Sequence, residues 1–160
     1  MEKKKLSVTA IVLIVLAVIV VWGIGAYNSL VKNEEGVKSA WSQVENVYQR
    51  RADLIPNLVA TVKGYATHES ATLEGVVEAR AKATQMTVNV DDLSEEKIAE
   101  FQKAQGELGS ALGRLMAITE AYPDLKANEN FRDLQAQLEG TENRIAVERK
   151  AYNQVAQEYN

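Results

Sequence analysis

The stretch QRRADLIPNLV, residues 49–59, decides the fold because it places Pro56 inside an apolar pattern that otherwise predicts one long helix. Proline removes a backbone donor and clashes with the carbonyl four residues back, which costs about 3 kcal/mol in a helix interior. No Gly, Asn or Ser lies between Tyr48 and Pro56 to form a tight reversal, although Asp53 could cap a new helix. We therefore expect a helix that kinks at Pro56 and continues, with a reversal there as the alternative.

The apolar pattern keeps its phase across the proline. Side chains recur at steps of four and three, a spacing typical of the seam between helices packed as in a coiled coil. A hairpin would usually reset this count, yet Ile55 and Leu58 both fall where it predicts them. The seam comprises Val37, Trp41, Val44, Tyr48, Arg51, Ile55, Leu58, Val62 and Tyr65. After a phase drift near His68, the stripe continues to about residue 85 through Leu73, Val76, Val77, Ala81 and Thr84.

Two further helices follow a break. Residues 85–93, QMTVNVDDL, contain turn-forming Asn and Asp, and Ser94 with acidic residues behind it marks a helix start. The first of these helices stops at Pro123, and its stripe is Phe101, Gln105, Leu108, Leu112, Leu115, Thr119 and Tyr122. The second opens at Asn128, with a stripe of Phe131, Leu134, Leu138, Ile145, Tyr152, Val155 and Tyr159. Because that pattern has no terminator, we expect the natural chain to continue beyond Asn160.

Composition sets the fold class. The chain has 160 residues, 46% hydrophobic and 25% charged, with only two prolines and nine glycines. Such scarcity of chain breakers favours long helices over a sheet with many turns, so we predict an all-α protein. The absence of cysteine excludes disulfides, thiolate metal ligands and a cysteine nucleophile.

Residues 6–27, LSVTAIVLIVLAVIVVWGIGAY, predict a transmembrane helix because no side chain in them is charged. At about 1.5 Å per residue they reach about 33 Å, enough for a hydrocarbon core of about 30 Å. A cleavable signal peptide is the alternative. The uncharged run from Leu6 to Val21 already exceeds the usual length of a signal-peptide core, which favours a retained anchor.

Charge predicts the orientation and excludes one class of partner. Three lysines in residues 1–5 precede the apolar stretch, whereas Lys32 on the other flank is accompanied by Glu34 and Glu35. This bias predicts a cytoplasmic basic tail, a single pass through the plasma (inner) membrane, and an extracytoplasmic domain over residues 28–160. Beyond the tail there are 15 basic and 21 acidic residues, a net charge of −6, which opposes nucleic-acid binding.

Several segments, read together, resemble the LemA family. They are YNSLV at 27–31, AWSQVENVYQRRADLIPNLV at 40–59, VKGYATHE at 62–69, LEGVVEARAKA at 73–83 and YN at 152–153. The resemblance implies one N-terminal span and an antiparallel bundle of about four long helical segments, the first two forming one helix if the chain continues past Pro56. It also implies a membrane-associated scaffold, connected with membrane or envelope organisation or found beside membrane metallopeptidases. It implies no reaction.

No residue pattern in the sequence predicts catalysis, a cofactor or a metal site. The single histidine, His68, cannot supply the paired Glu-x-x-His motifs of a di-iron bundle or an H-E-x-x-H zinc site. Glu74 and Glu78 share a helix face, but Glu78 also has Lys82 four residues ahead as an ion-pair partner. We therefore interpret these residues as a solvated helix surface and predict that the protein is not an enzyme.

Arg51 occupies a seam position whose neighbours are apolar. We favour an aliphatic stem lying along the seam with its guanidinium in water. The alternative is a pair with an acidic residue of a facing helix, which would fix the register of the bundle.

Helix lengths lead to the functional hypothesis. A single helix over residues 28–85 would reach about 87 Å, whereas the later helices would reach about 45 Å each and could not cover it. The uncovered stripe predicts a homo-oligomer, with an interface of Val37, Trp41, Val44, Tyr48 and Arg51. We expect a scaffold that self-associates at the lipid bilayer; the alternative is a binding adaptor for a membrane protein partner, such as a metallopeptidase, or for another envelope component.

Overall fold

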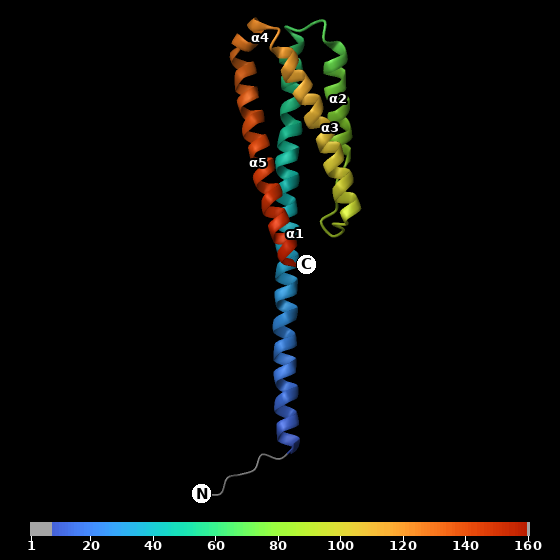
Figure 1. Cartoon of the computed structure of the whole chain (residues 1–160), viewed down its shortest axis with the longest axis vertical. Coiled ribbons are helices and arrows are strands. Elements are labelled where there is room, and N and C mark those ends of the chain that lie inside the picture. Colours follow the sequence, from blue (N-terminus) through green and yellow to red (C-terminus); the bar gives the residue numbers. More distant parts are fainter. Residues whose placement is uncertain (1–7, 160) are drawn as a thin grey trace.

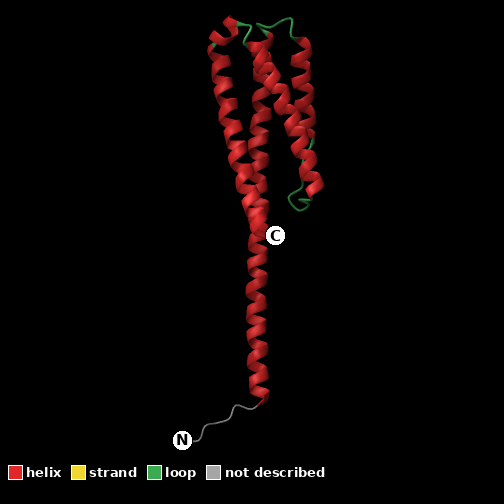
Figure 2. Cartoon of the chain, viewed as in Figure 1, coloured by secondary structure: helices red, strands yellow, loops and turns green. Residues whose placement is uncertain are grey.

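The computed structural model describes residues 8–159, and every regular element in that range is a helix (Figures 1 and 2). The predicted all-α fold is confirmed. The helices are α1 (Val8–Lys63), α2 (Ser70–Gln85), α3 (Glu95–Thr119), α4 (Pro123–Ala127) and α5 (Glu129–Tyr159). The predicted basic tail, the first two residues of the predicted span, and Asn160 lie outside the described residues.

Helix α1 passes through Pro56 without interruption, so the predicted continuation is confirmed and the alternative of a reversal is wrong. The proline ring is exposed, whereas Ile55 and Leu58 beside it are fully buried. Pro56 has no N–H to donate to the carbonyl of Ala52. That carbonyl instead accepts a hydrogen bond of 2.8 Å from Nε of Arg80 on α2. The backbone acceptor that the proline leaves unpaired is therefore satisfied by a side chain from a neighbouring helix.

The chain does reverse, but seven residues later than the proline, and the expectation of one helix to about residue 85 is wrong. After Lys63 the amides of Gly64 and Tyr65 bond to carbonyls three residues back, and the fully buried Ala66 anchors the turn. Helix α2 then packs against α1. The phase drift near His68 marked this reversal.

The bundle is antiparallel, as expected, with α4 as a short turn at the end far from the predicted span (Figure 1). Figure 1 shows α5 on one side of α1 and the α2–α3 hairpin on the other. The predicted helix starts are present: Ser94 accepts a 3.5 Å hydrogen bond from the amide of Lys97, and Asn128 accepts one of 2.9 Å from Phe131.

The seam of α1 is buried by the chain itself. Trp41, Val44, Tyr48 and Arg51 are each at most 4% exposed, so the expectation that α1 leaves this stripe uncovered is wrong. The reason is geometric, because α5 packs along α1 more extensively than any other helix and reaches as far as Gly36, whose Cα faces Val155. Val37 is half-buried and Tyr65 lies exposed beyond the end of the helix. No exposed stripe therefore remains on this face for a second copy.

The buried side chains form two cores, one on each side of the level of Arg51. The distal core, far from the predicted span, is mainly aliphatic and comprises Ile55, Leu58, Val62, Ala66, Leu73, Val76, Ala83, Leu108, Ala111, Leu112, Leu115, Leu125, Phe131 and Leu138. The proximal core, nearer the predicted span, comprises Trp41, Val44, Tyr48, Val88, Phe101, Ile145 and Tyr152.

The N-terminal part of α1 lies outside the bundle. It contains an apolar stretch long enough to cross a bilayer, and none of that stretch is buried against the rest of the chain. No helix end separates the predicted span from the predicted domain over residues 28–160, because α1 continues from one into the other. The boundary at residue 27 stays a prediction.

Candidate functional site: a polar layer and the groove beside it

Arg51 forms the centre of a buried polar layer between the two cores. Its side chain is only 3% exposed. Nη1 donates to a carboxylate oxygen of Glu142 at 3.0 Å, and Nη2 donates to the backbone and side-chain oxygens of Gln105 at 2.8 and 2.7 Å. The interpretation with the guanidinium in water is therefore wrong, and the alternative of a pair with an acid on a facing helix is confirmed.

The layer joins all four long helices. Gln105 on α3 also donates through Nε2 to the carbonyl of Ala83 on α2 at 3.2 Å. Arg51 belongs to α1 and Glu142 to α5, so each helix contributes at least one polar group at this level. Sliding any one helix by a turn would leave buried donors without acceptors, and the layer consequently fixes the register of the bundle.

The charge of Arg51 is only partly compensated within the layer. Its guanidinium carbon lies 5.0 Å from the ring centre of Tyr48, and Glu142, its carboxylate partner, is 44% exposed. Nε of Arg51 is buried and, in the described part of the chain, has no hydrogen-bond partner. Burying an incompletely compensated charge lowers the stability of the fold, but it favours one arrangement of the helices over the others.

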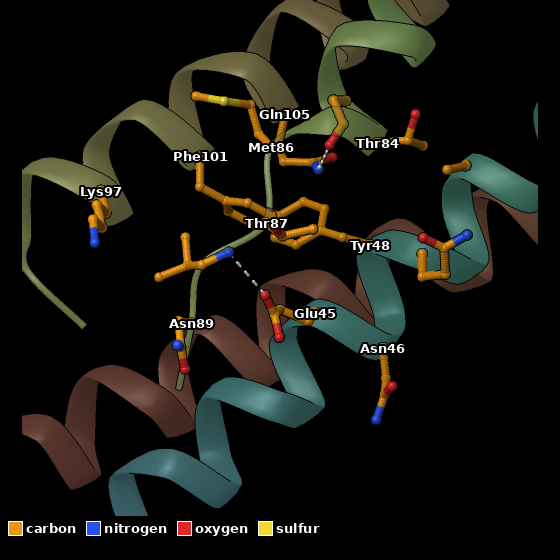
Figure 3. A pocket seen from close by; sticks show the side chains of 14 residues that line it. Glu45, Asn46, Tyr48, Thr84, Met86, Thr87, Asn89, Lys97, Phe101 and Gln105 are labelled. Carbon is orange, nitrogen blue, oxygen red and sulfur yellow. Dashed lines mark hydrogen bonds between the residues drawn. The ribbon is translucent and has the colours of Figure 1, made fainter. Parts of the chain in front are cut away.

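A groove opens beside the layer because α2 ends at Gln85, level with it, while α3 begins ten residues later at Glu95. Only the connecting loop covers the space below the end of α2. The groove has a volume of about 460 Å³ and is lined by Glu45, Asn46, Tyr48, Gln49, Ala52, Ala83, Thr84, Met86, Thr87, Val88, Asn89, Lys97, Phe101 and Gln105. In Figure 3, Thr87 and Tyr48 lie near its middle, with Lys97, Asn89 and Asn46 around it.

Two contacts hold the loop on α1. The amide of Val88 donates to a carboxylate oxygen of Glu45 at 3.3 Å, which Figure 3 marks with a dashed line. Farther along, the ammonium of Lys38 lies 2.8 Å from Asp91 and 3.0 Å from Glu34. Hydrogen bonds to Asp91 and then to Glu34 raise the pKa of Lys38 above its ordinary value. The loop is thus attached to α1 at two points, Lys38 and Glu45.

Aromatic rings form the wall behind the groove. Trp41 makes edge-to-face contacts with Phe101 and Tyr152 at ring-centre distances of 5.3 and 5.1 Å, and Tyr48 contacts Phe101 at 5.3 Å. Burial raises the pKa of the Tyr48 hydroxyl, an effect that nearby Arg149 and Arg51 partly oppose. The indole N–H of Trp41 is buried, and no acceptor among residues 8–159 reaches it.

The residues weighed for metal or acid–base chemistry do not come together. His68 lies exposed in the turn after α1, and Glu74 and Glu78 are exposed on α2. Among residues 8–159, no group of three or more His, Cys, Asp or Glu side chains has the geometry to hold a metal ion. The structure therefore offers no arrangement that assigns these residues a chemical role.

Two functional contacts were missed by sequence reasoning. Gln105 was predicted only as a seam position, although an amide in an otherwise apolar stripe indicates a buried polar partner. Arg80 was not considered. The sequence feature that could have indicated this contact is Pro56, because a proline inside a helix leaves the carbonyl of Ala52 without its usual backbone donor.

Comparisons with known proteins agree with this architecture. A protein-family model described as the LemA family matches residues 40–160. The magnetosome protein MamQ 2 of Paramagnetospirillum magneticum is 27% identical over 151 residues, which cover 84% of this chain and 56% of that protein. Protein LemA of Metamycoplasma hominis is 24% identical over 137 residues, covering 86% of this chain and 59% of that protein. The chain thus spans a little more than half the length of these relatives.

Proposed function

The chain belongs to the LemA family, and from that premise we propose that it is a membrane-anchored, non-enzymatic scaffold whose bundle stands outside the cytoplasm. The observation that carries the proposal is the continuity of α1, which runs from an exposed apolar stretch into the buried seam of the bundle. A helix that is embedded at one end and packed at the other holds the bundle at a defined height above the bilayer.

The helical rise gives that height. From Tyr27, the end of the predicted span, to Gly36, which lies beside Val155 of α5, the helix covers about 14 Å at about 1.5 Å per residue. The groove residues Glu45 to Ala52 lie about 27 to 38 Å beyond Tyr27. The bundle would therefore contact neighbouring proteins rather than lipid head groups.

A non-enzymatic role fits the inventory of side chains. Among the described residues, the buried side chains of Arg51 and Gln105 join the helices, and those of Thr119 and Thr141 bond to carbonyls of their own helices. No group of acidic or histidine side chains in this range has the geometry to hold a metal ion. Neither the family name nor the names of the relatives state a reaction. An extracytoplasmic scaffold in membrane or envelope organisation accounts for these features.

Self-association remains part of the proposal, but it would use a different surface from the α1 seam. Large exposed apolar side chains are contiguous only in the N-terminal part of α1, including Leu16, Ile19 and Trp22, whereas those on the described bundle are scattered. Copies would therefore meet through their spans, by packing in the membrane.

Single cysteines introduced into this cysteine-free chain test the orientation. Lys3→Cys and Val147→Cys are each expressed in intact cells of a diderm host whose outer membrane has been made permeable, and exposed to a membrane-impermeant maleimide. We expect Val147→Cys, at an exposed position of α5, to react before lysis and Lys3→Cys only after it. The opposite pattern would place the bundle in the cytoplasm and contradict the proposed orientation.

Copy number is measured separately, by light scattering of the full chain in detergent and by disulfide scanning of residues 20–27 in membranes. Self-association predicts a mass above one copy and cross-linking that repeats with the helical period of about 3.6 residues. A monomer without cross-links would remove self-association and leave the anchored bundle, in which case the adaptor alternative becomes the better function. The groove beside the polar layer favours that alternative.

A further inference from the structure

We propose that the groove beside the polar layer binds an extended, uncharged polypeptide segment of a neighbouring membrane protein. This inference deepens the proposed function by naming what the scaffold holds, and its partner class rests on the anchored orientation. The groove is about 460 Å³ in volume, within the range of about 300 to 1,000 Å³ that ligand sites occupy.

The groove offers uncommitted neutral hydrogen-bonding groups. Among residues 8–159, no hydrogen bond uses the side-chain amide of Asn46 or the hydroxyl of Thr87. Gln49 donates to Asp53 at 2.8 Å and keeps its carbonyl oxygen free. An amide side chain carries the same donor and acceptor as a peptide group, so this set matches the hydrogen-bonding pattern of polypeptide backbone.

One side of the groove is formed by the backbone of the loop that follows α2. The loop segment TVNV, residues 87–90, alternates polar and apolar residues, and Met86 before it already has extended angles of φ −83° and ψ 104°. Thr87, Val88 and Asn89 all line the groove; Val88 is also buried in the proximal core, whereas Thr87 and Asn89 are exposed. No hydrogen bond within the described residues uses the backbone amide of Thr87. Such an amide can donate to a carbonyl of a bound extended segment, as unpaired backbone amides do when a peptide is recognised through its main chain.

The same residues disfavour other ligand classes. A sugar site usually offers an exposed aromatic face, but Tyr48 and Phe101 are each 4% exposed and contact one another edge to face. A phosphate site needs free cations, and the nearest, Lys97, is paired with Asp92. The unpaired charge that remains beside the groove is that of Glu45, whose carboxylate already accepts from the loop. Neutral backbone is the ligand that these groups can satisfy.

Height above the membrane limits the partner. The groove lies about 27 to 38 Å from the end of the predicted span, and an extended chain rises about 3.3 Å per residue. A tail or loop of a neighbouring membrane protein therefore needs about eight or more residues beyond its own span to reach it. A partner must therefore have an extracytoplasmic segment of about eight or more residues.

The experiment uses the full chain immobilised in nanodiscs and an end-blocked octapeptide library of Ala, Ser, Thr, Val, Asn and Gln. Retained peptides are remade with a fluorophore, and their affinity is measured by anisotropy. Thr87→Pro removes this unpartnered loop amide, and Met86 already has the extended conformation that the residue before proline requires. Asn46→Ala removes a free amide, and Asn143→Ala, exposed on α5, is the matched control.

We expect wild type and Asn143→Ala to bind within about twofold of each other, and Thr87→Pro and Asn46→Ala to bind at least about tenfold more weakly. Thermal unfolding checks each variant, and Asn46→Ala decides the matter if Thr87→Pro does not fold. Failure to retain any neutral peptide, equal affinity in Asn46→Ala, or displacement of the peptide by chitotetraose would overturn the inference. Binding in nanodiscs depends on neither orientation nor copy number, so this outcome is independent of the tests of the proposed function.

Discussion

The distal and proximal cores of this bundle differ in the side chains that form them and in the elements that cover them. In the described part of the chain, the distal core has fourteen buried side chains, of which Phe131 is the one aromatic, and all five helices contribute to it. The proximal core has seven, four of them aromatic, and the loop after α2 replaces a helix on one side. Aliphatic side chains fill a helical interior closely, whereas a few large rings can close a core whose helical wall is incomplete.

Because of this difference, we expect the two cores to contribute differently to the stability of the bundle. The distal core has fully buried side chains from all five helices, so its loss should unfold the whole bundle. The proximal core is bordered by the groove and held on one side by single contacts such as that of Glu45 with Val88. Openings confined to this half are therefore less costly than global unfolding.

The largest expected effect compares one deletion in each core. Leu108→Ala removes a fully buried distal side chain and should lower the free energy of unfolding by about 2 to 5 kcal/mol. Val44→Ala removes two carbons from the proximal core and should cost about 1.6 kcal/mol, at about 0.8 per buried carbon. Urea denaturation of the full chain in detergent, followed by circular dichroism, gives both values.

Amide hydrogen exchange sharpens the same comparison, with Val77→Ala at an exposed position of α2 as the control. Leu108→Ala should speed exchange in every helix of the bundle, whereas Val44→Ala should speed it mainly in residues 86–101. Uniform acceleration by both variants would show that the two cores unfold as one unit and would break the comparison.

A smaller effect is expected at the layer that divides the cores. Arg51→Met leaves Gln105 without its charged donor and should destabilise the bundle by about 1 to 3 kcal/mol. Glu142→Gln should cost less, about 1 kcal/mol or below, because that carboxylate is 44% exposed and water screens its charge. Chemical denaturation of both variants and of the double variant gives the coupling between the side chains. A more stable Arg51→Met protein would mean that the layer provides register alone.

The smallest expected effect concerns alkaline pH and the proximal core. Because burial raises the pKa of Tyr48 above its unfolded value of about 10, the associated stability is present below about pH 10. It is lost as the pH rises through the folded value, since ionisation places a charge among apolar rings. Tyr48→Phe should therefore lose less stability than wild type between pH 9 and pH 11, as measured by thermal unfolding. Parallel curves for the two proteins would contradict this assignment.

Periodicity predicted most of the fold. The four-and-three spacing identified the large buried side chains of α1 from Trp41 to Val62 and those of α3 from Phe101 to Thr119, but it missed the buried alanines at 52, 104 and 111. A stripe reports which face of a helix is buried. It does not report which neighbour buries it, and for this reason the reversal after Lys63 and the covering of Trp41 by the same chain were missed.

The polar contacts were less predictable because each depends on two distant residues. Arg51 was recognised as unusual, but its partner Glu142 lies 91 positions away in the chain, and one sequence does not indicate which acidic residue will face it. The bond from Arg80 to Ala52 spans 28 positions and compensates for a proline elsewhere. Local patterns therefore predict helices and buried faces, whereas pairings across the bundle require the tertiary arrangement.

Because α1 is uninterrupted, the rotational orientation of the bundle about the helix axis is fixed relative to that of the predicted span. Adding one residue between Tyr27 and Glu34 would turn every outer face of the bundle by about 100° relative to the lipid-embedded part, because a helix has about 3.6 residues per turn. Adding four residues would lift the bundle by about 6 Å and return it to within about 40° of its original orientation about the helix axis. Which neighbours the groove can meet is thus set by the angular phase of a short connecting segment as well as by its length.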